Sequence, residues 1–201
     1  QVERLEALVR WHHPELGMIS PAEFIPLAEG TLLINPFTKW LLDQTISQLA
    51  FWLRESFDVC LSINFSMKNF QDSMMIDHIH ETLRKYKIPA QNLEIEITET
   101  AFTDNLQHVA KVLHTLREIG VRIAIDDFGT GQSSLHYLLE LPFDVLKIDQ
   151  VFTRNMLKNL GAEAIVRNAI LLGHELNLEV VAEGVQSEAE FRKLKDLKCL
   201  F

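Results

Sequence analysis

The sequence predicts an α/β fold of parallel strands and helices, and it favours a TIM-type (β/α)8 barrel over an open doubly wound sheet. Short β-rich runs alternate with longer runs of helical periodicity, which is typical of βα units. Each predicted strand also carries, at or next to its C-terminal end, a side chain that can bind a metal ion or move a proton. In a closed barrel these ends meet at one mouth, where active sites lie, whereas an open sheet would spread them along an edge.

Six strands are predicted, at residues 4–9, 59–64, 93–97, 122–126, 144–148 and 179–182. Helices are predicted between them at 37–54, 74–86, 106–119 and 162–176. The first of these helices has an apolar face with helical spacing, formed by Phe37, Trp40, Leu41, Ile46, Leu49 and Leu53. Gly120 follows the third helix where a stop is expected, and the next strand begins at once.

Composition limits the functions that the chain can have. Its 201 residues are 47% hydrophobic and 23% charged, as expected for one ordinary globular domain. The net charge is −9 and no basic patch is interleaved with aromatic residues, so binding to duplex nucleic acid is not expected. Cys60 and Cys199 are isolated, which favours a reduced, intracellular setting. No apolar run approaches the ~18 residues that a membrane span needs, so this segment is expected to make no membrane contact.

The polar residues at the strand ends point to metal chemistry. They are Glu6, Asn64, Glu96 with Glu99 just beyond it, Asp126 with Asp127, Lys147 with Asp149, and Glu183. A single strand-end Asp or Asn is most often a helix cap or a turn residue, but a polar group on every strand favours convergence on one site. Carboxylates that point at one place stay ionised only with a cation between them, and oxygen ligands suit Mg²⁺ or Mn²⁺.

The adjacent pair Asp126 and Asp127 suggests two ions. One carboxylate can bridge both ions while its neighbour binds the second, and two ions about 3.5–4 Å apart clamp the attacking and leaving oxygens of a phosphoryl displacement. Glu94 and Glu96 lie on one face of their strand, opposite three aliphatic residues. From the residues alone, an unrelated barrel enzyme that uses strand-end carboxylates and a lysine on a carboxylate substrate, as enolase-like proteins do, remains an alternative.

Seven motifs in this order and spacing resemble those of EAL domains. They are Glu6-Ala7-Leu8, PAEFIPLAE at 21–29, INFS at 63–66, EIEITE at 94–99, DDFGTG at 126–131, LKID at 146–149 and VAEGV at 181–185. The chain resembles this family of cyclic di-GMP-specific phosphodiesterases along essentially its whole length. The resemblance implies a single EAL domain over residues 1–201, truncated at both ends, because the family's first and last barrel strands are missing from the chain.

The resemblance also implies roles for individual residues. Glu6, Asn64, Glu96 and Asp126 match the ligands of a first metal, and Asp126, Asp127 and Glu183 match those of a second. The catalytic set is Lys147, Glu183, Glu99 and Asp127; in it Lys147 orients the water and meets the phosphate, and Glu99 holds the loop from Asp127 to Ser134. The substrate contacts are Leu8, Arg10, Asn64, Asp126, Lys147 and Gln186. Gln186 stands where the family usually has Glu.

By resemblance, two Mg²⁺ or Mn²⁺ ions activate a water that hydrolyses cyclic di-GMP to linear pGpG. The alternative is a catalytically silent EAL module that binds cyclic di-GMP or a protein partner as a signalling receptor. The family further implies a homodimer, an adjacent GGDEF or sensor domain, and a place in the cytoplasm or in the cytoplasmic portion of a membrane-anchored bacterial protein.

Overall fold

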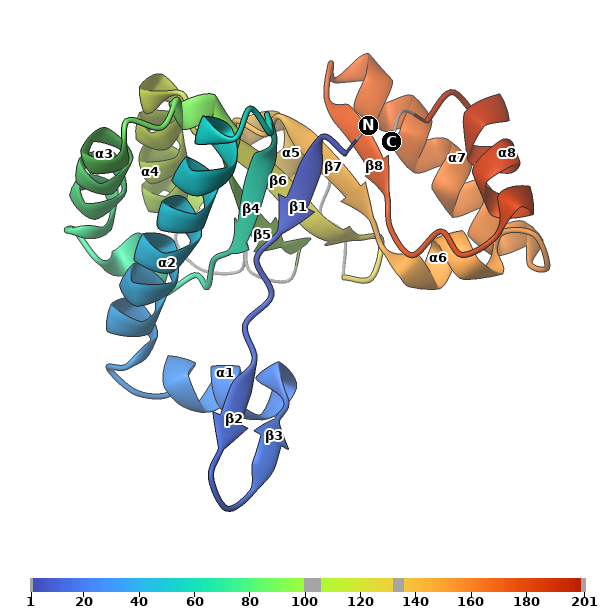
Figure 1. The fold of residues 1–201 in the computed structure, drawn as a ribbon. Helices are drawn as coiled ribbons and strands as arrows, with labels where there is room; N and C mark the ends of the chain where they lie inside the picture. The colour runs from blue at the N-terminus through green and yellow to red at the C-terminus, as the bar shows by residue number, and fades with distance from the viewer. Residues whose placement is uncertain (1, 100–105, 132–135, 200–201) are drawn as a thin grey trace. The chain divides into compact units, whose positions relative to one another are not determined.

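The computed structural model describes residues 2–99, 106–131 and 136–199 (Figure 1). The chain forms two compact units, the first made of Gln1–Ile95 with His114–Arg122 and the second of Glu96–Leu113 with Ile123–Phe201. Within the described residues, all six predicted strands are present, as are all four predicted helices. No helix in this part of the chain is long and apolar enough to cross a membrane.

The first unit contains the strand order β1-β4-β5. Strand β1 (Arg4–Glu6) runs parallel to β4 (Cys60–Asn64), and β5 (Leu93–Thr98) continues into the second unit. Helices α2 (Ile34–Arg54) and α3 (Met75–Tyr86) pack together through side chains that water does not reach, such as Ile46 and Ile79. Two short 3₁₀ turns, Asn69–Gln71 and Ala90–Asn92, connect these elements.

The predicted strand 4–9 is too long, because the chain leaves the sheet after Glu6. It then forms a hairpin that was not predicted, with β2 (Trp11–His13) antiparallel to β3 (Gly17–Ile19). Gly17 has a φ of +74°, which glycine tolerates and which lets the hairpin turn. Helix α1 (Pro21–Glu29) follows, and the Ser20 hydroxyl caps it by accepting from the backbone N–H of Ala22. In Figure 1 the hairpin and α1 lie beyond the C-terminal end of β1.

The second unit contains the strand order β5-β6-β7-β8. Strand β6 (Arg122–Phe128) runs parallel to β7 (Val145–Ile148), which runs parallel to β8 (Glu179–Ala182). The helices that complete the βα units are α4 (Leu106–Ile119), which crosses between the units, α5 (His136–Glu140), α6 (Gln150–Asn155), α7 (Leu160–Glu175) and α8 (Glu188–Asp196). Helix α8 begins with a capping box in which Ser187 and Glu190 satisfy each other's backbone N–H groups.

The strands in the core of the second unit are mostly apolar, and a charged residue interrupts two of them. Ile123, Ala124 and Ile125 in β6, like Val145, Leu146 and Ile148 in β7, are fully buried. Strands covered on both faces read as continuous apolar runs. Asp126 and Lys147 interrupt these runs and are themselves buried. A charge in such a place costs free energy unless it is paired, so these two residues must have partners.

Helix α7 packs so closely on β8 that Gly173 has no room for a side chain. A Cβ on Gly173 would overlap the Cγ2 atom of Val180. We expect Gly173→Ala to lower the free energy of unfolding by about 1–3 kcal/mol, because the strand must shift to accept the methyl group. Urea denaturation checks this, with Gly30→Ala as the control, since its added Cβ would meet atoms only at 3.5 Å. Equal stability of the Gly173 variant and the parent would contradict the close packing.

Candidate metal and catalytic site

The ammonium group of Lys147 lies among three carboxylates of the second unit. Lys147 Nζ is 2.8 Å from Glu96 Oε2, 3.0 Å from Asp126 Oδ1 and 2.8 Å from Glu183 Oε1. The three acids come from β5, from β6 and from the residue after β8, while Lys147 is on β7. The side chains of Lys147 and Glu96 are only 8% and 2% exposed, so solvent screens this pair weakly.

This arrangement determines the charge of Lys147. Burial by itself would lower the pKa of the ammonium group, but Glu96, Asp126 and Glu183 outweigh burial and raise the pKa of Lys147 above its usual range. The lysine therefore stays protonated at neutral pH. Its positive charge is what makes the close approach of three carboxylates tolerable, two of which, Glu96 and Asp126, are buried.

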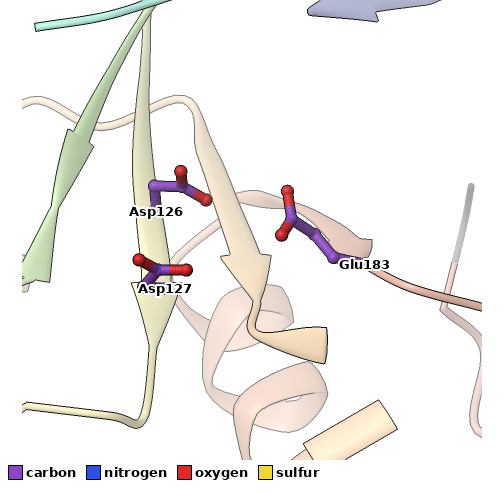
Figure 2. A group of neighbouring side chains, drawn as sticks. All are labelled: Asp126, Asp127 and Glu183. Carbon is purple, nitrogen blue, oxygen red and sulfur yellow. The ribbon is translucent and has the colours of Figure 1, made fainter. Parts of the chain in front are cut away.

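Asp126, Asp127 and Glu183 form a second cluster that shares two acids with the first (Figure 2). One carboxylate oxygen from each lies within 4.8 Å of the others. Neighbouring residues of a strand normally point to opposite faces, so an adjacent pair needs a local irregularity to act together. Strand β6 has one, because its register with β7 shifts between Ile125 and Phe128 and Asp127 has a φ of +54°. Aspartate accepts this left-handed conformation more readily than most residues do.

The carboxyl group of Asp127 is electrostatically crowded. Burial, the charge of Asp126 and a hydrogen bond with Asp149 raise the pKa of Asp127 from 3.8 to about 7. Asp149 itself caps α6, with Oδ1 accepting from the backbone N–H of Val151 at 2.6 Å. The sequence alone assigns no role to Asp149, although the residue stands two positions after Lys147, directly after β7. A cation beside Asp127 would oppose this rise in pKa.

Glu99 holds the glycine-rich segment that follows β6. Its Oε2 atom accepts from the backbone N–H groups of Gly129 at 2.8 Å and Gly131 at 3.3 Å. Gly129 has a φ of +99°, and a Cβ there would come within 2.8 Å of the Phe152 ring. A Cβ on Gly131 would come within 2.9 Å of the Glu99 carboxylate. The predicted loop runs to Ser134, and its residues 132–134 lie outside the described residues.

In the first unit, Glu6 and Asn64 meet at the ends of adjacent strands. The Asn64 amide donates to Glu6 Oε1 at 2.7 Å. The chain after Asn64 is fixed by Asn69, which is fully buried. Its Oδ1 atom accepts from the backbone N–H of Ser66 at 2.9 Å, and its amide donates to side chains of α2 at Asn35 and Thr38. This buried network anchors the segment that follows Asn64 to helix α2.

Glu94 has partners of its own in the first unit. Its Oε2 atom is 3.2 Å from Arg122 Nε and 3.7 Å from Arg4 Nε. Glu94 and Glu96, which are both 2% exposed, are thus neutralised by different cations. Glu94 therefore pairs with two arginines of the first unit and is not part of the Lys147 cluster.

The remaining predicted substrate contacts are exposed side chains. Leu8 is 57% exposed, Arg10 donates from Nη1 to the Val9 carbonyl at 2.8 Å, and Gln186 follows β8 on the way to α8. The structure gives Gln186 a backbone hydrogen bond to Glu190 Oε2 at 2.8 Å, while its side chain faces solvent.

The donor groups fit divalent cations. Asp126, Asp127 and Glu183 offer only carboxylate oxygens, and Glu6 and Asn64 offer a carboxylate and an amide. Hard oxygen ligands of this kind select Mg²⁺ or Mn²⁺ over softer metals. Four carboxylates, those of Glu96, Asp126, Asp127 and Glu183, surround the single ammonium group of Lys147, so the cluster has room for further positive charge.

The chain is similar to known proteins of one family. The sequence profile of the family described as "EAL domain" matches residues 1–201. The chain is 43% identical to Signaling protein YkoW of Bacillus subtilis, covering 96% of this chain and 24% of that protein. It is 40% identical to Cyclic di-GMP phosphodiesterase PA2567 of Pseudomonas aeruginosa, covering 97% and 33%. The chain thus spans about a quarter to a third of these relatives.

A solved structure described as "PaMucR Phosphodiesterase, c-di-GMP complex" is also similar. Its TM-score is 0.90 at 39% identity, and the match covers 96% of this chain and 79% of that one. Together with the parallel βα order, this confirms the predicted TIM-type α/β fold class.

Asp127 should make the stability of the chain depend on pH when EDTA removes metal ions. An acid whose pKa is raised on folding contributes stability that is fully present below its pKa in the unfolded chain. This contribution is lost as the pH rises through its pKa in the folded chain, here between about pH 4 and about pH 7. Asp127→Asn removes that loss. Relative to the parent, the variant should gain on the order of 1–2 kcal/mol between pH 4.5 and pH 8.

Urea denaturation in EDTA at several pH values measures this difference. Asp77→Asn, at an exposed position on α3, is the control and should show a much smaller change. A difference between Asp127→Asn and the parent that does not vary with pH would contradict the crowding of Asp127.

Proposed function

This chain belongs to the EAL domain family, and from that premise we propose that it hydrolyses cyclic di-GMP to linear pGpG. The observation that carries the proposal is the pairing of a protonated lysine with a carboxylate cluster that fits divalent cations. Relatives named cyclic di-GMP phosphodiesterases, and a related structure described as a complex with c-di-GMP, support the substrate.

Two Mg²⁺ or Mn²⁺ ions are part of the proposal. Asp126, Asp127 and Glu183 would hold one. The family resemblance assigns Glu6, Asn64, Glu96 and Asp126 to the other. Bound divalent ions lower the pKa of water and stabilise negative charge on phosphoryl oxygens.

Lys147 acts as a fixed positive charge and hydrogen-bond donor. Because the pKa of Lys147 is raised, its ammonium group is not a general base at neutral pH and does not form a Schiff base with a carbonyl. It can instead donate to a phosphate oxygen or orient a water through its N–H groups. This argues against the enolase-like alternative where the lysine would remove a proton from a carboxylate substrate.

Glu99 and Asp149 are proposed to hold Asp127 in place. Glu99 fixes the backbone two and four residues after Asp127, and Asp149 hydrogen-bonds its carboxyl group. Carboxylates that are already held in position need little rearrangement when a cation binds or when charge develops on the substrate. The homodimer, the adjacent GGDEF or sensor domain and the cytoplasmic location stay predictions from the family.

Hydrolysis of cyclic di-GMP with Mg²⁺ or Mn²⁺, followed by chromatography, tests the proposal. We expect pGpG to form only with metal and to be lost in Glu6→Ala. Binding of cyclic di-GMP without any product would instead favour the silent receptor.

Asp126→Asn should abolish turnover while the chain stays folded. The substitution keeps the size of the side chain but removes a negative charge that both proposed ions share, so we expect kcat to fall at least about 10³-fold. Steady-state kinetics over a range of Mg²⁺ concentrations provides the measurement, and circular dichroism monitors folding. Asp196→Asn, on the exposed end of α8, is the matched control. Metal-dependent rates like those of the parent would rule out a shared ligand at Asp126.

A further inference from the structure

Asn64 is an exposed side chain, so its direction depends on the backbone that carries it. It stands at the end of β4, where the pairing with β1 ends, and its amide donates to Glu6 Oε1 at 2.7 Å. The Asn64 Oδ1 atom is then the group that can bind a cation. Because packing holds an exposed side chain only weakly, the segment that follows Asn64 needs an anchor of its own.

Asn69 provides this anchor from the turn that follows β4. Its side chain is 0% exposed, and its Oδ1 atom accepts from the backbone N–H of Ser66 at 2.9 Å. The backbone N–H of Asn69 donates in return to the Ser66 carbonyl at 2.9 Å. These two hydrogen bonds close a turn that begins two residues after Asn64.

The side-chain amide of Asn69 uses both of its N–H donors. They donate to Asn35 Oδ1 at 2.9 Å and to Thr38 Oγ1 at 3.1 Å, and both acceptors are on α2. A flipped amide would point its N–H groups at the N–H of Ser66, so only one orientation satisfies the network. The network therefore sets the position of the turn after Asn64 relative to α2.

Packing alone does not require an amide at this place. The rings of Phe65 and Phe70 are buried and their centroids lie 5.8 Å apart, so the segment already has apolar packing. A buried polar group costs free energy unless its hydrogen bonds are made, and an apolar side chain of similar size avoids this cost. The Asn69 amide therefore contributes direction, which apolar packing does not specify.

A second contact ties the same segment to α2. Lys39 Nζ is 2.7 Å from Asp72 Oδ2, and this hydrogen bond lowers the pKa of Asp72 below its usual value. The other carboxylate oxygen of Asp72 accepts from the backbone N–H of Met74 at 2.9 Å. The segment that contains Asn69 and Asp72 thus meets α2 at two places.

We propose that Asn69 is a positioning residue for Asn64: through the closed turn at Ser66 it fixes the backbone that presents the Asn64 amide oxygen to a divalent cation. Asn69 is fully buried and acts through the backbone, not by contact with the ion. Thr38 shares this role because it accepts from the Asn69 amide. This inference rests on the proposed function, in which the family resemblance assigns Asn64 to a metal, and it adds the residue that holds this ligand in place.

Two buried threonines form a matched pair for the test. Thr38 on α2 accepts from Asn69, whereas Thr82 on α3 donates to Asp43 Oδ1 on α2 at 3.2 Å. Their side chains are similarly buried, since the residues are 3% and 5% exposed. Valine keeps the shape of threonine and removes one hydrogen bond to α2 or from it, so both variants should lose similar stability in urea. Only Thr38→Val breaks a hydrogen bond of the Asn69 network.

Binding of Mn²⁺ without substrate, followed by calorimetry and by electron paramagnetic resonance, measures the consequence. We expect Thr38→Val to weaken the binding of one Mn²⁺ ion about threefold or more and to reduce the spin-coupled signal, whereas Thr82→Val changes the affinity less than about 1.5-fold. Thr38→Ser keeps the hydroxyl group and should restore the affinity of the parent. Equal Mn²⁺ affinities for Thr38→Val and Thr82→Val would overturn the proposal.

Asn69→Leu is the stronger variant, because it keeps the size of the side chain and removes all of its hydrogen bonds. We expect it to weaken the binding of one Mn²⁺ ion about tenfold or more, close to the loss in Asn64→Ala. Circular dichroism checks that the variants are folded. If Asn69→Leu does not fold, the milder pair Thr38→Val and Thr82→Val decides the question.

Hydrolysis assays separate this inference from the proposed function. If the parent forms pGpG and Asn64→Ala alone weakens Mn²⁺ binding, the function stands and the positioning role of Asn69 is wrong. If Asn69→Leu and Asn64→Ala both weaken Mn²⁺ binding but the parent yields no pGpG, the positioning role stands and the hydrolysis fails. If neither variant alters Mn²⁺ binding, the positioning role is wrong, and pGpG formation by the parent decides the function separately.

Discussion

The ion-paired ammonium of Lys147 is the interaction on which the candidate site depends. Three carboxylates from three parts of the chain approach it within 3.0 Å, and the Lys147 side chain itself is only 8% exposed. Without this charge the three carboxylates would repel one another, and some of them would take up a proton. With it, Asp127 still adds a further carboxylate beside Asp126 and Glu183, and burial together with the charge of Asp126 raises the pKa of Asp127 to about 7. A folded, partly neutralised site of this kind is suited to attract divalent cations.

The fold delivers these groups through two ordinary features of parallel sheets. Strands with both faces covered place their few polar residues against one another, so Lys147 on β7 faces Asp126 on β6. The irregularity at Asp127 then adds a neighbouring carboxylate that a regular strand would turn away. Glu99 holds the segment that follows through two glycine N–H groups, so the irregular backbone has its own support.

The strand-end residues can be picked out from the sequence because each is recognised from the few residues around it. A polar residue that closes an apolar run can be recognised without knowing its partners, which is why Glu96, Asp126, Lys147 and Glu183 could be singled out together. What they contact depends on neighbours far along the chain, as the pairing of Glu94 with Arg4 and Arg122 shows. Sequence periodicity puts Glu94 and Glu96 on one face, but only the folded sheet separates their roles.

Other features could not be predicted for the same reason. The chain leaves the sheet after Glu6 and forms the β2–β3 hairpin. Each of these two strands has only 3 residues, which is too few to show the alternation of apolar and polar residues that predicts a strand. The left-handed backbone at Asp127 and the hydrogen bond between Asp127 and Asp149 depend on strand register and helix capping. A pocket of the first unit, lined by residues such as Trp11, Phe24 and Phe37, combines side chains from β2, α1 and α2, and nothing in the separate segments indicates that they enclose a hollow.

Binding of Mn²⁺ itself, measured by calorimetry and by electron paramagnetic resonance on the chain without substrate, tests the metal centre most directly. We expect two Mn²⁺ ions for each chain, bound closely enough for their spins to couple. A chain that is folded but binds no Mn²⁺ at millimolar concentration would contradict the claim that this carboxylate cluster is a metal centre.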